Sequence, residues 1–125
     1  MKEIFGELFE LTDIQGVLYY SFEGKLEFDD MSLIPEKIEK DWEKLLNDRF
    51  DFKPLLTYFE NIQDVEFFFE NRRIYIKKIS TGFIVVLLGN FLPIGVVRLN
   101  CELIAPSLEN IKKSKGLGWF FKKKR

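Results

Sequence analysis

The spacing of apolar residues changes several times along the chain and predicts a mixture of helices and strands. An apolar stripe at helical spacing predicts a short helix over residues 4–11, and Gly16 is the expected turn after it. Apolar and aromatic residues then predict a hairpin, with strands over 17–22 and 25–28 joined by Glu23-Gly24. The first part of the chain therefore reads as helix, strand, strand.

The middle of the chain has helical spacing and is interrupted by proline. From Pro35 to about Asp48, apolar and charged residues segregate to opposite sides of a helix. Pro54 breaks this pattern, so we expect a second, shorter helix from there to about Ile62. The pattern thus predicts a kinked helical segment between the second and third strands.

Three strand-like runs follow, at residues 64–70, 73–79 and 83–88. The short links Asn71-Arg72 and Thr81-Gly82 are typical of antiparallel hairpins. The third run, FIVVLL, is apolar throughout, which predicts a central strand covered on both faces.

Residues 93–111 fit two different periods. As a strand they alternate apolar and polar residues, but the alternation ends at Ile104. As a helix they carry one long apolar stripe, and Asn90 and Pro93 are residue types that open helices. We therefore predict a helix, which Pro106 kinks or divides. Its apolar stripe consists of Ile94, Val97, Cys101, Ile104, Leu108 and Ile111.

The resulting order is α-β-β-α-β-β-β-α, which predicts a layered α/β fold with a five-stranded antiparallel sheet and helices on both faces. In this order, the stretches DIQGVLYYSFEGKLEF (13–28) and LPIGVVRLNCELIAPSLENI (92–111) resemble the roadblock/LC7 family. That family includes dynein light chains, bacterial polarity regulators that act on a small GTPase, and lysosomal signalling scaffolds. Longin and profilin-like folds share the same layered plan and stay open as alternatives. The resemblance covers residues 1–111, which we take as one domain.

The resemblance implies a homodimer in which the third strand pairs with its copy and the middle helices pack side by side. The interface residues would be Trp42 and Leu46 on the middle helix and Phe67, Phe68 and Phe69 on the strand. It also implies that a small GTPase docks on the helical surface of the dimer. An ordinary structural reading stands beside it: Trp42 packs on the sheet, Phe67 and Phe69 are core, and Phe68 lies beneath a local helix.

Composition argues against catalysis. The chain has no histidine, the commonest general base near neutral pH and a frequent zinc ligand, and it has a single cysteine, Cys101, which cannot form an internal disulfide. The Gly116-Leu-Gly118 motif lacks the third glycine of a dinucleotide-binding loop. We expect a non-enzymatic protein without cofactor or metal.

Charge is divided unevenly along the chain. Seven of its 19 basic residues lie in residues 112–125, which contain no acid, so this tail carries +7 and residues 1–111 carry −8. Basic and aromatic residues together suit an anionic membrane surface. The alternatives are a solubilising tail that docks on the protein itself and, less favoured because the body is acidic, nucleic-acid binding. The candidate contact residues are Lys112, Lys113, Lys115, Trp119, Phe120, Phe121, Lys122, Lys123, Lys124 and Arg125.

Two functional hypotheses follow. The first is a non-catalytic dimeric scaffold of roadblock type that binds or regulates a small GTPase in signalling. The second is a membrane-surface adaptor that the C-terminal tail targets. In either case we expect a cytoplasmic protein, because the N-terminus lacks the features of a secretory signal and the longest apolar run, residues 83–88, is too short to span a bilayer.

Overall fold

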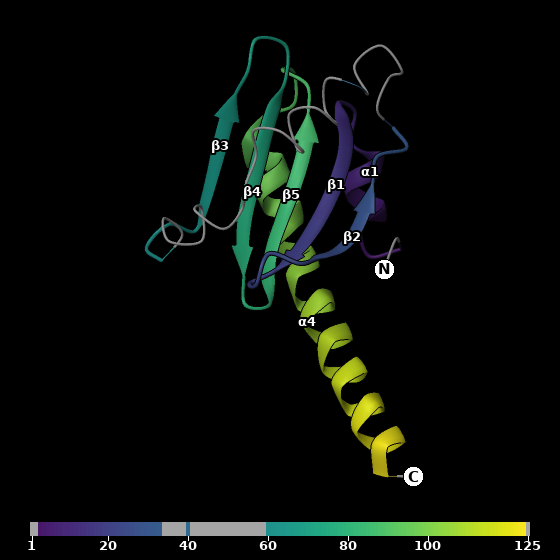
Figure 1. Cartoon of the computed structure of the whole chain (residues 1–125). Helices are drawn as coiled ribbons and strands as arrows, with labels where there is room; N and C mark the ends of the chain where they lie inside the picture. Colours follow the sequence, from purple (N-terminus) through teal and green to yellow (C-terminus); the bar gives the residue numbers. More distant parts are fainter. Residues whose placement is uncertain (1–2, 34–39, 41–59, 125) are drawn as a thin grey trace.

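The computed structural model describes residues 3–33, 40 and 60–124, and its strands form one antiparallel sheet in the order β2-β1-β5-β4-β3 (Figure 1). This confirms the predicted five-stranded antiparallel sheet. The strands are β1 (Ile14–Ser21), β2 (Leu26–Asp30), β3 (Asp64–Phe68), β4 (Arg73–Ile79) and β5 (Gly82–Leu88), and the helices include α1 (Gly6–Glu10) and α4 (Ile94–Lys124).

The central position of β5 follows from its sequence. Every residue of β5 is buried, and the strand pairs with β1 on one side and β4 on the other. A strand with both neighbours in place and both faces covered has no polar face, which explains the uninterrupted apolar run and confirms its predicted place.

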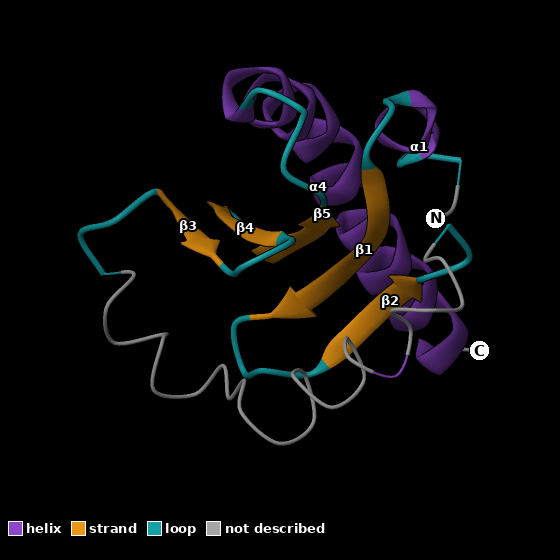
Figure 2. Cartoon of the chain, turned by 90° about the horizontal axis from the view of Figure 1, so that it is seen from above, coloured by secondary structure: helices purple, strands orange, loops and turns teal. Residues whose placement is uncertain are grey.

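The helices α1 and α4 lie on the same face of the sheet (Figure 2). Phe5 and Leu8 join the buried stripe of α4 in one core with alternate residues of β1, β4 and β5. The opposite face has a second core, which includes Leu18, Ile74 and Val85. The helical segment predicted to cover that face, residues 35–62, falls almost wholly outside the described residues.

Residues 94–111 are helical, as their longer apolar stripe predicted. Val97, Cys101, Ile104 and Leu108 are all buried against the sheet. Pro106 lies within α4, and the helix continues past it. Asn90 does not cap the helix, since its side-chain amide donates to the carbonyl of Glu70 at 3.3 Å.

The helix α4 runs through the expected domain boundary at residue 111 without a break and ends at Lys124. Its C-terminal half extends well beyond the edge of the sheet (Figure 1). The segment 112–124 is therefore the distal part of α4, and its separate role as a tail stays a prediction.

The prediction that Gly16 forms the turn between α1 and β1 was wrong. Gly16 lies within β1, where an added Cβ would come within 3.3 Å of the Leu87 side chain, so close packing accounts for the glycine. The turn is made by Asp13, whose φ is 86°. Aspartate tolerates this left-handed conformation better than most residues. The other predicted turn glycine, Gly24, is confirmed with φ 85°.

Candidate protein-interaction surface

The strand β3 is an edge of the sheet, with β4 on one side. The Phe69 amide donates to the Arg72 carbonyl and the Lys78 amide to the Gln63 carbonyl, so odd-numbered residues face β4. Alternate residues of an antiparallel strand turn their backbone groups to opposite sides. The amides and carbonyls of Asp64, Glu66 and Phe68 therefore face away from β4, toward a side where no strand of residues 3–33, 40 and 60–124 lies and where another strand could pair.

The side chains of β3 alternate as the sequence predicted. Val65, Phe67 and Phe69 pack against the core on the face away from α4. Phe68 points to the other face and is 73% exposed, so the alternative that it lies beneath a helix is wrong. Trp42 and Leu46, the other predicted interface residues, lie outside the described residues.

A buried arginine holds the end of β3 and the β5–α4 connection together. Arg73, which pairs with Phe68 in the ladder, places its Nη1 3.0 Å from Glu66 Oε2. Its Nε donates to the carbonyl of Gly89 at 2.8 Å and its Nη2 to the carbonyl of Leu92 at 2.6 Å. These partners satisfy a charge that is almost fully buried, so the two segments are fixed relative to each other.

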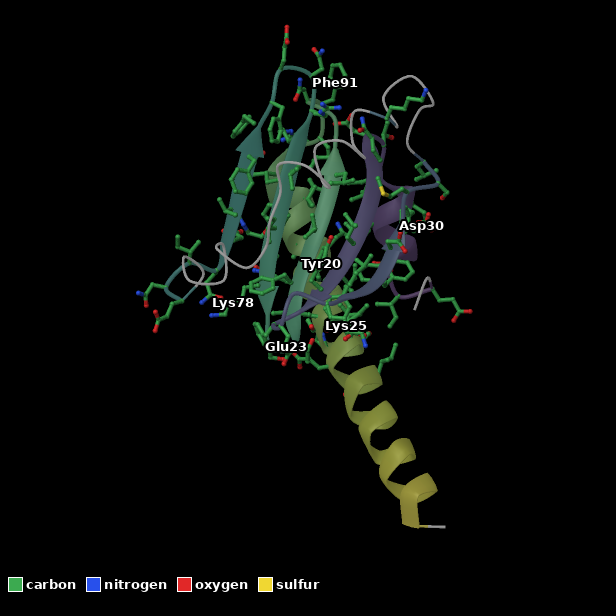
Figure 3. The ribbon with its side chains drawn as sticks, in the orientation of Figure 1. Tyr20, Glu23, Lys25, Asp30, Lys78 and Phe91 are labelled. Atoms are coloured by element: carbon green, nitrogen blue, oxygen red, sulfur yellow. The ribbon has the colours of Figure 1, made fainter. Side chains whose placement is uncertain are left out.

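Asp13, the residue before β1, also belongs to this network. Its Oδ2 lies 3.8 Å from Arg73 Nη2 and accepts hydrogen bonds from the amides of Phe91 at 2.8 Å and Leu92 at 3.0 Å. Phe91 is nevertheless 90% exposed, at the end of the sheet shown in Figure 3. A large apolar side chain is thus held in solvent by a fixed backbone, which is typical of contact residues.

A second polar cluster ties β3 to α4. Asp64 Oδ2 accepts hydrogen bonds from Tyr75 Oη at 2.7 Å and from Arg98 Nε at 2.5 Å. Burial works against the charged form of Asp64, but the two hydrogen bonds outweigh it and lower the pKa of the carboxyl. Burial, followed by the bond to Asp64, raises the pKa of Tyr75. The cluster fixes the edge strand against the helix and contains no free nucleophile.

The helix α4 carries a second apolar stripe on the side away from the sheet. Val96, Leu99 and Leu103 are 37%, 55% and 62% exposed, at spacings of three and four residues. Outside this outer stripe, Glu102 on α4 is half exposed and lies 3.6 Å from Lys77 Nζ on β4.

The described residues offer little for catalysis. Among residues 3–33, 40 and 60–124, no three metal-ligating side chains come together. Burial raises the pKa of Cys101 to about 12, which suppresses its thiolate. A shallow cavity of about 290 Å³, lined by Gly6, Phe9, Asp30, Ser32 and Leu33, presents one carboxyl group and no partner base.

The basic and aromatic candidates, Lys112 to Arg125, lie on the distal part of α4 up to Lys124. They therefore belong to the same helix as the outer stripe, which the sequence did not indicate. Within the part of the chain that the structure describes, no helix combines the length and apolar content needed to cross a bilayer.

Comparison with family models and with curated proteins found no match to this chain.

Sequence reasoning missed Phe91 and the outer stripe of α4. The signal for the stripe was present, because Val96, Leu99 and Leu103 recur at helical spacing on the side opposite Val97 and Cys101. The sequence gives no comparable indication for Phe91, because a single aromatic residue in a loop has no periodic spacing with its neighbours.

Proposed function

We propose that the chain is a non-catalytic dimeric scaffold of roadblock type that binds or regulates a small GTPase. The single observation that carries the proposal is the open edge of β3, which offers the backbone groups of Asp64, Glu66 and Phe68 beside an exposed phenylalanine. Edge strands of this kind are normally covered or charged. Pairing with a second copy of β3 would extend the sheet across two subunits.

The fixed geometry around the edge supports this proposal. Arg73 on β4 forms an ion pair with Glu66, and Arg98 and Tyr75 donate hydrogen bonds to Asp64. These bonds fix β3 in place within a single subunit. A preorganised edge loses less conformational entropy on pairing. Phe68 adds apolar area at the same edge.

Two substitutions at Phe68 test the dimer. Phe68→Pro removes an amide that faces the open edge and leaves the bonds to β4 intact, so the subunit should fold. Phe68→Thr keeps that amide and suits a strand. We expect Phe68→Pro to halve the mass measured by light scattering, and Phe68→Thr to preserve the wild-type mass. A wild-type monomer at tens of micromolar would contradict the dimer.

The GTPase part of the proposal rests on the family resemblance and has its own test. A small GTPase from the same organism would be loaded with GDP or with a non-hydrolysable GTP analogue and titrated calorimetrically. We expect binding in one nucleotide state and a loss of binding in Trp42→Ala, since the resemblance places the docking surface on the middle helices. Equal affinity in both states would contradict regulation, while the dimer would stand.

A membrane-surface adaptor is the second candidate, and the extension of α4 beyond the sheet favours it. Lys112, Lys113 and Lys115 and the final four basic residues would contact anionic headgroups. Sedimentation with phosphatidylserine vesicles would compare the full chain with a chain ending at Ser114. Stronger binding by the full chain supports the adaptor, and equal binding contradicts it.

A further inference from the structure

The outward-facing backbone groups of β3 are arranged symmetrically about Glu66, the middle residue of the strand Asp64–Phe68. Two copies that pair antiparallel with Glu66 opposite Glu66 place Asp64 of each copy opposite Phe68 of the other, so every outward-facing residue exchanges hydrogen bonds. Because only alternate residues face outward, the next registers are two residues away. Either shift would place one of these residues opposite a residue outside the strand. The geometry therefore favours the register centred on Glu66.

The acidic side chains of β3 do not oppose this pairing. Like charges directly opposite each other destabilise a sheet, and charged residues normally protect an edge strand against pairing. Here each carboxylate has a cation within its own subunit. Glu66 Oε2 lies 3.0 Å from Arg73 Nη1, and Asp64 Oδ2 accepts a hydrogen bond from Arg98 Nε at 2.5 Å. The strand can therefore lie beside an identical strand without an uncompensated charge.

Phe68 and Arg98 are both left partly uncovered by the fold of one subunit. Phe68 is 73% exposed, and the Arg98 side chain is 45% exposed. We propose that the Phe68 ring packs on the guanidinium of Arg98 of a second copy, and that the two-fold axis of the dimer repeats this contact. Arg98 is then the residue through which the edge of β3 selects another copy of this chain. The inference rests on the β3 dimer proposed above.

The register centred on Glu66 brings the two side chains within reach. Asp64 and Phe68 point to the same face of the sheet, and residues directly opposite each other have Cβ atoms about 5 Å apart. Arg98 is bonded to Asp64, so its guanidinium lies where the ring of the second copy arrives. A cation attracts an aromatic face within about 6 Å of the ring centre. Arginine suits this contact because its planar group stacks on rings and is weakly hydrated.

A single subunit cannot make this contact. Asp64, which holds Arg98, and Phe68 lie at opposite ends of β3, roughly 13 Å apart at about 3.3 Å per residue. Only an antiparallel copy brings the end with Phe68 beside the end with Arg98. The complementary groups therefore lie on the same surface of each copy and meet reciprocally, as a two-fold interface requires.

Cysteine pairing tests the register. In the register centred on Glu66, position 65 lies opposite position 67 of the second copy, on the face away from α4. We expect a disulfide when Val65→Cys and Phe67→Cys chains are mixed and oxidised, and little within either variant alone. Cys101 is buried and does not compete. Lys25→Cys, at the exposed β1–β2 hairpin, is the control and should not pair with Val65→Cys.

Cross-links confined to one cysteine variant would indicate a shifted register. Val65→Cys alone would pair if position 65 lay on the two-fold axis, and Phe67→Cys alone would pair if position 67 lay there. Either result would overturn the proposal, because Phe68 would then not lie opposite Asp64.

A double-mutant cycle tests the contact itself. Phe68→Leu keeps an apolar side chain but removes the aromatic face. It should raise the Kd of the dimer about tenfold in sedimentation equilibrium, because the contact occurs twice in each dimer. In the Arg98→Gln background the same substitution should raise Kd less than about twofold, since the cation is already absent. Equal effects in both backgrounds would overturn the proposal.

Two controls accompany the cycle. Arg98 is partly exposed, so Arg98→Gln should fold, and circular dichroism checks this. Lys25→Gln removes an exposed cation at the β1–β2 hairpin and should leave Kd unchanged. Light scattering of Phe68→Thr is made far above Kd, where a dimer weakened tenfold keeps its mass.

Failure of the contact and failure of the β3 dimer give different results. A wild-type chain that stays monomeric at tens of micromolar would overturn the dimer and the contact with it. A stable dimer in which Phe68→Leu and Arg98→Gln act additively, or in which positions 65 and 67 do not cross-link, would overturn only the contact.

Discussion

The guanidinium of Arg73 on β4 donates to the backbone carbonyl of Leu92, 2.6 Å away in the β5–α4 connection. Through this bond and its partners Glu66, Gly89 and Asp13, one buried side chain fixes both the edge strand and the loop that presents Phe91. The positions of the candidate contact residues Phe68 and Phe91 therefore depend on the buried charge of Arg73.

Replacing Arg73 by methionine should destabilise the protein by about 3 kcal/mol, because it leaves the partly buried Glu66 carboxylate and the carbonyls of Gly89 and Leu92 without their donor. Chemical denaturation measures this loss. Lys25→Met, at an exposed hairpin position, is the matched control and should change stability by about 0.5 kcal/mol at most. Equal stability of both variants would contradict the role of Arg73.

Alanine substitution at the two glycines that flank the β5–α4 connection should change the free energy of unfolding in opposite directions. A Cβ at Gly89 would lie 2.0 Å from Asp13 Oδ1, and Asp13 is held in place by Phe91 and Leu92. Gly89→Ala should therefore lower the free energy of unfolding by about 2 kcal/mol. Gly95 is helical with open space around it, so Gly95→Ala should raise it by up to about 1 kcal/mol. Destabilisation by both variants would contradict this assignment.

Much of the fold could be predicted because periodicity reports local environment. The uninterrupted apolar run of β5 reflects a strand with two buried faces, and the longer stripe through Val97 and Leu108 reflects a helix on the sheet. The Asp13 turn could not be predicted, because a left-handed aspartate leaves no pattern and Gly16 stood nearby as the more usual candidate.

The Arg73 network escaped prediction for another reason. Its members lie far apart in the sequence, and an arginine at the start of a strand is ordinarily read as solvent-exposed. The interaction surface was only partly predicted. Phe68 was named as an interface candidate, but Leu99 and Leu103 of the outer stripe were read only as apolar positions of the strand alternative.

The single thiol should be unreactive in the folded protein. Burial raises the pKa of Cys101 to about 12, so very little of the reactive thiolate forms at pH 8. Labelling with a chromogenic disulfide should be at least about a hundredfold slower than in guanidinium-unfolded protein. An added exposed thiol in Leu99→Cys should label rapidly under the same conditions. Fast labelling of wild-type protein would show that Cys101 is accessible.

Acid should weaken the link between β3 and α4. The pKa of Asp64 is lowered in the folded state, because the bonds from Tyr75 and Arg98 outweigh its partial burial. A lowered folded-state pKa means that the stabilisation is present above the unfolded value of about 3.9 and is lost as pH falls through the folded value.

The variant Asp64→Asn isolates this contribution. It keeps an oxygen acceptor for Tyr75 but removes the charge that Arg98 pairs with, so it should cost about 1 kcal/mol at pH 7, a modest value because Arg98 is partly exposed. The difference from wild type should shrink at pH 3, because this pH lies below the unfolded value and part of the stabilisation has been lost there. Urea denaturation at the two pH values measures both quantities, with the exposed Glu60→Gln as control. A difference that is the same at pH 3 and pH 7 would mean that the charge of Asp64 does not stabilise the edge strand.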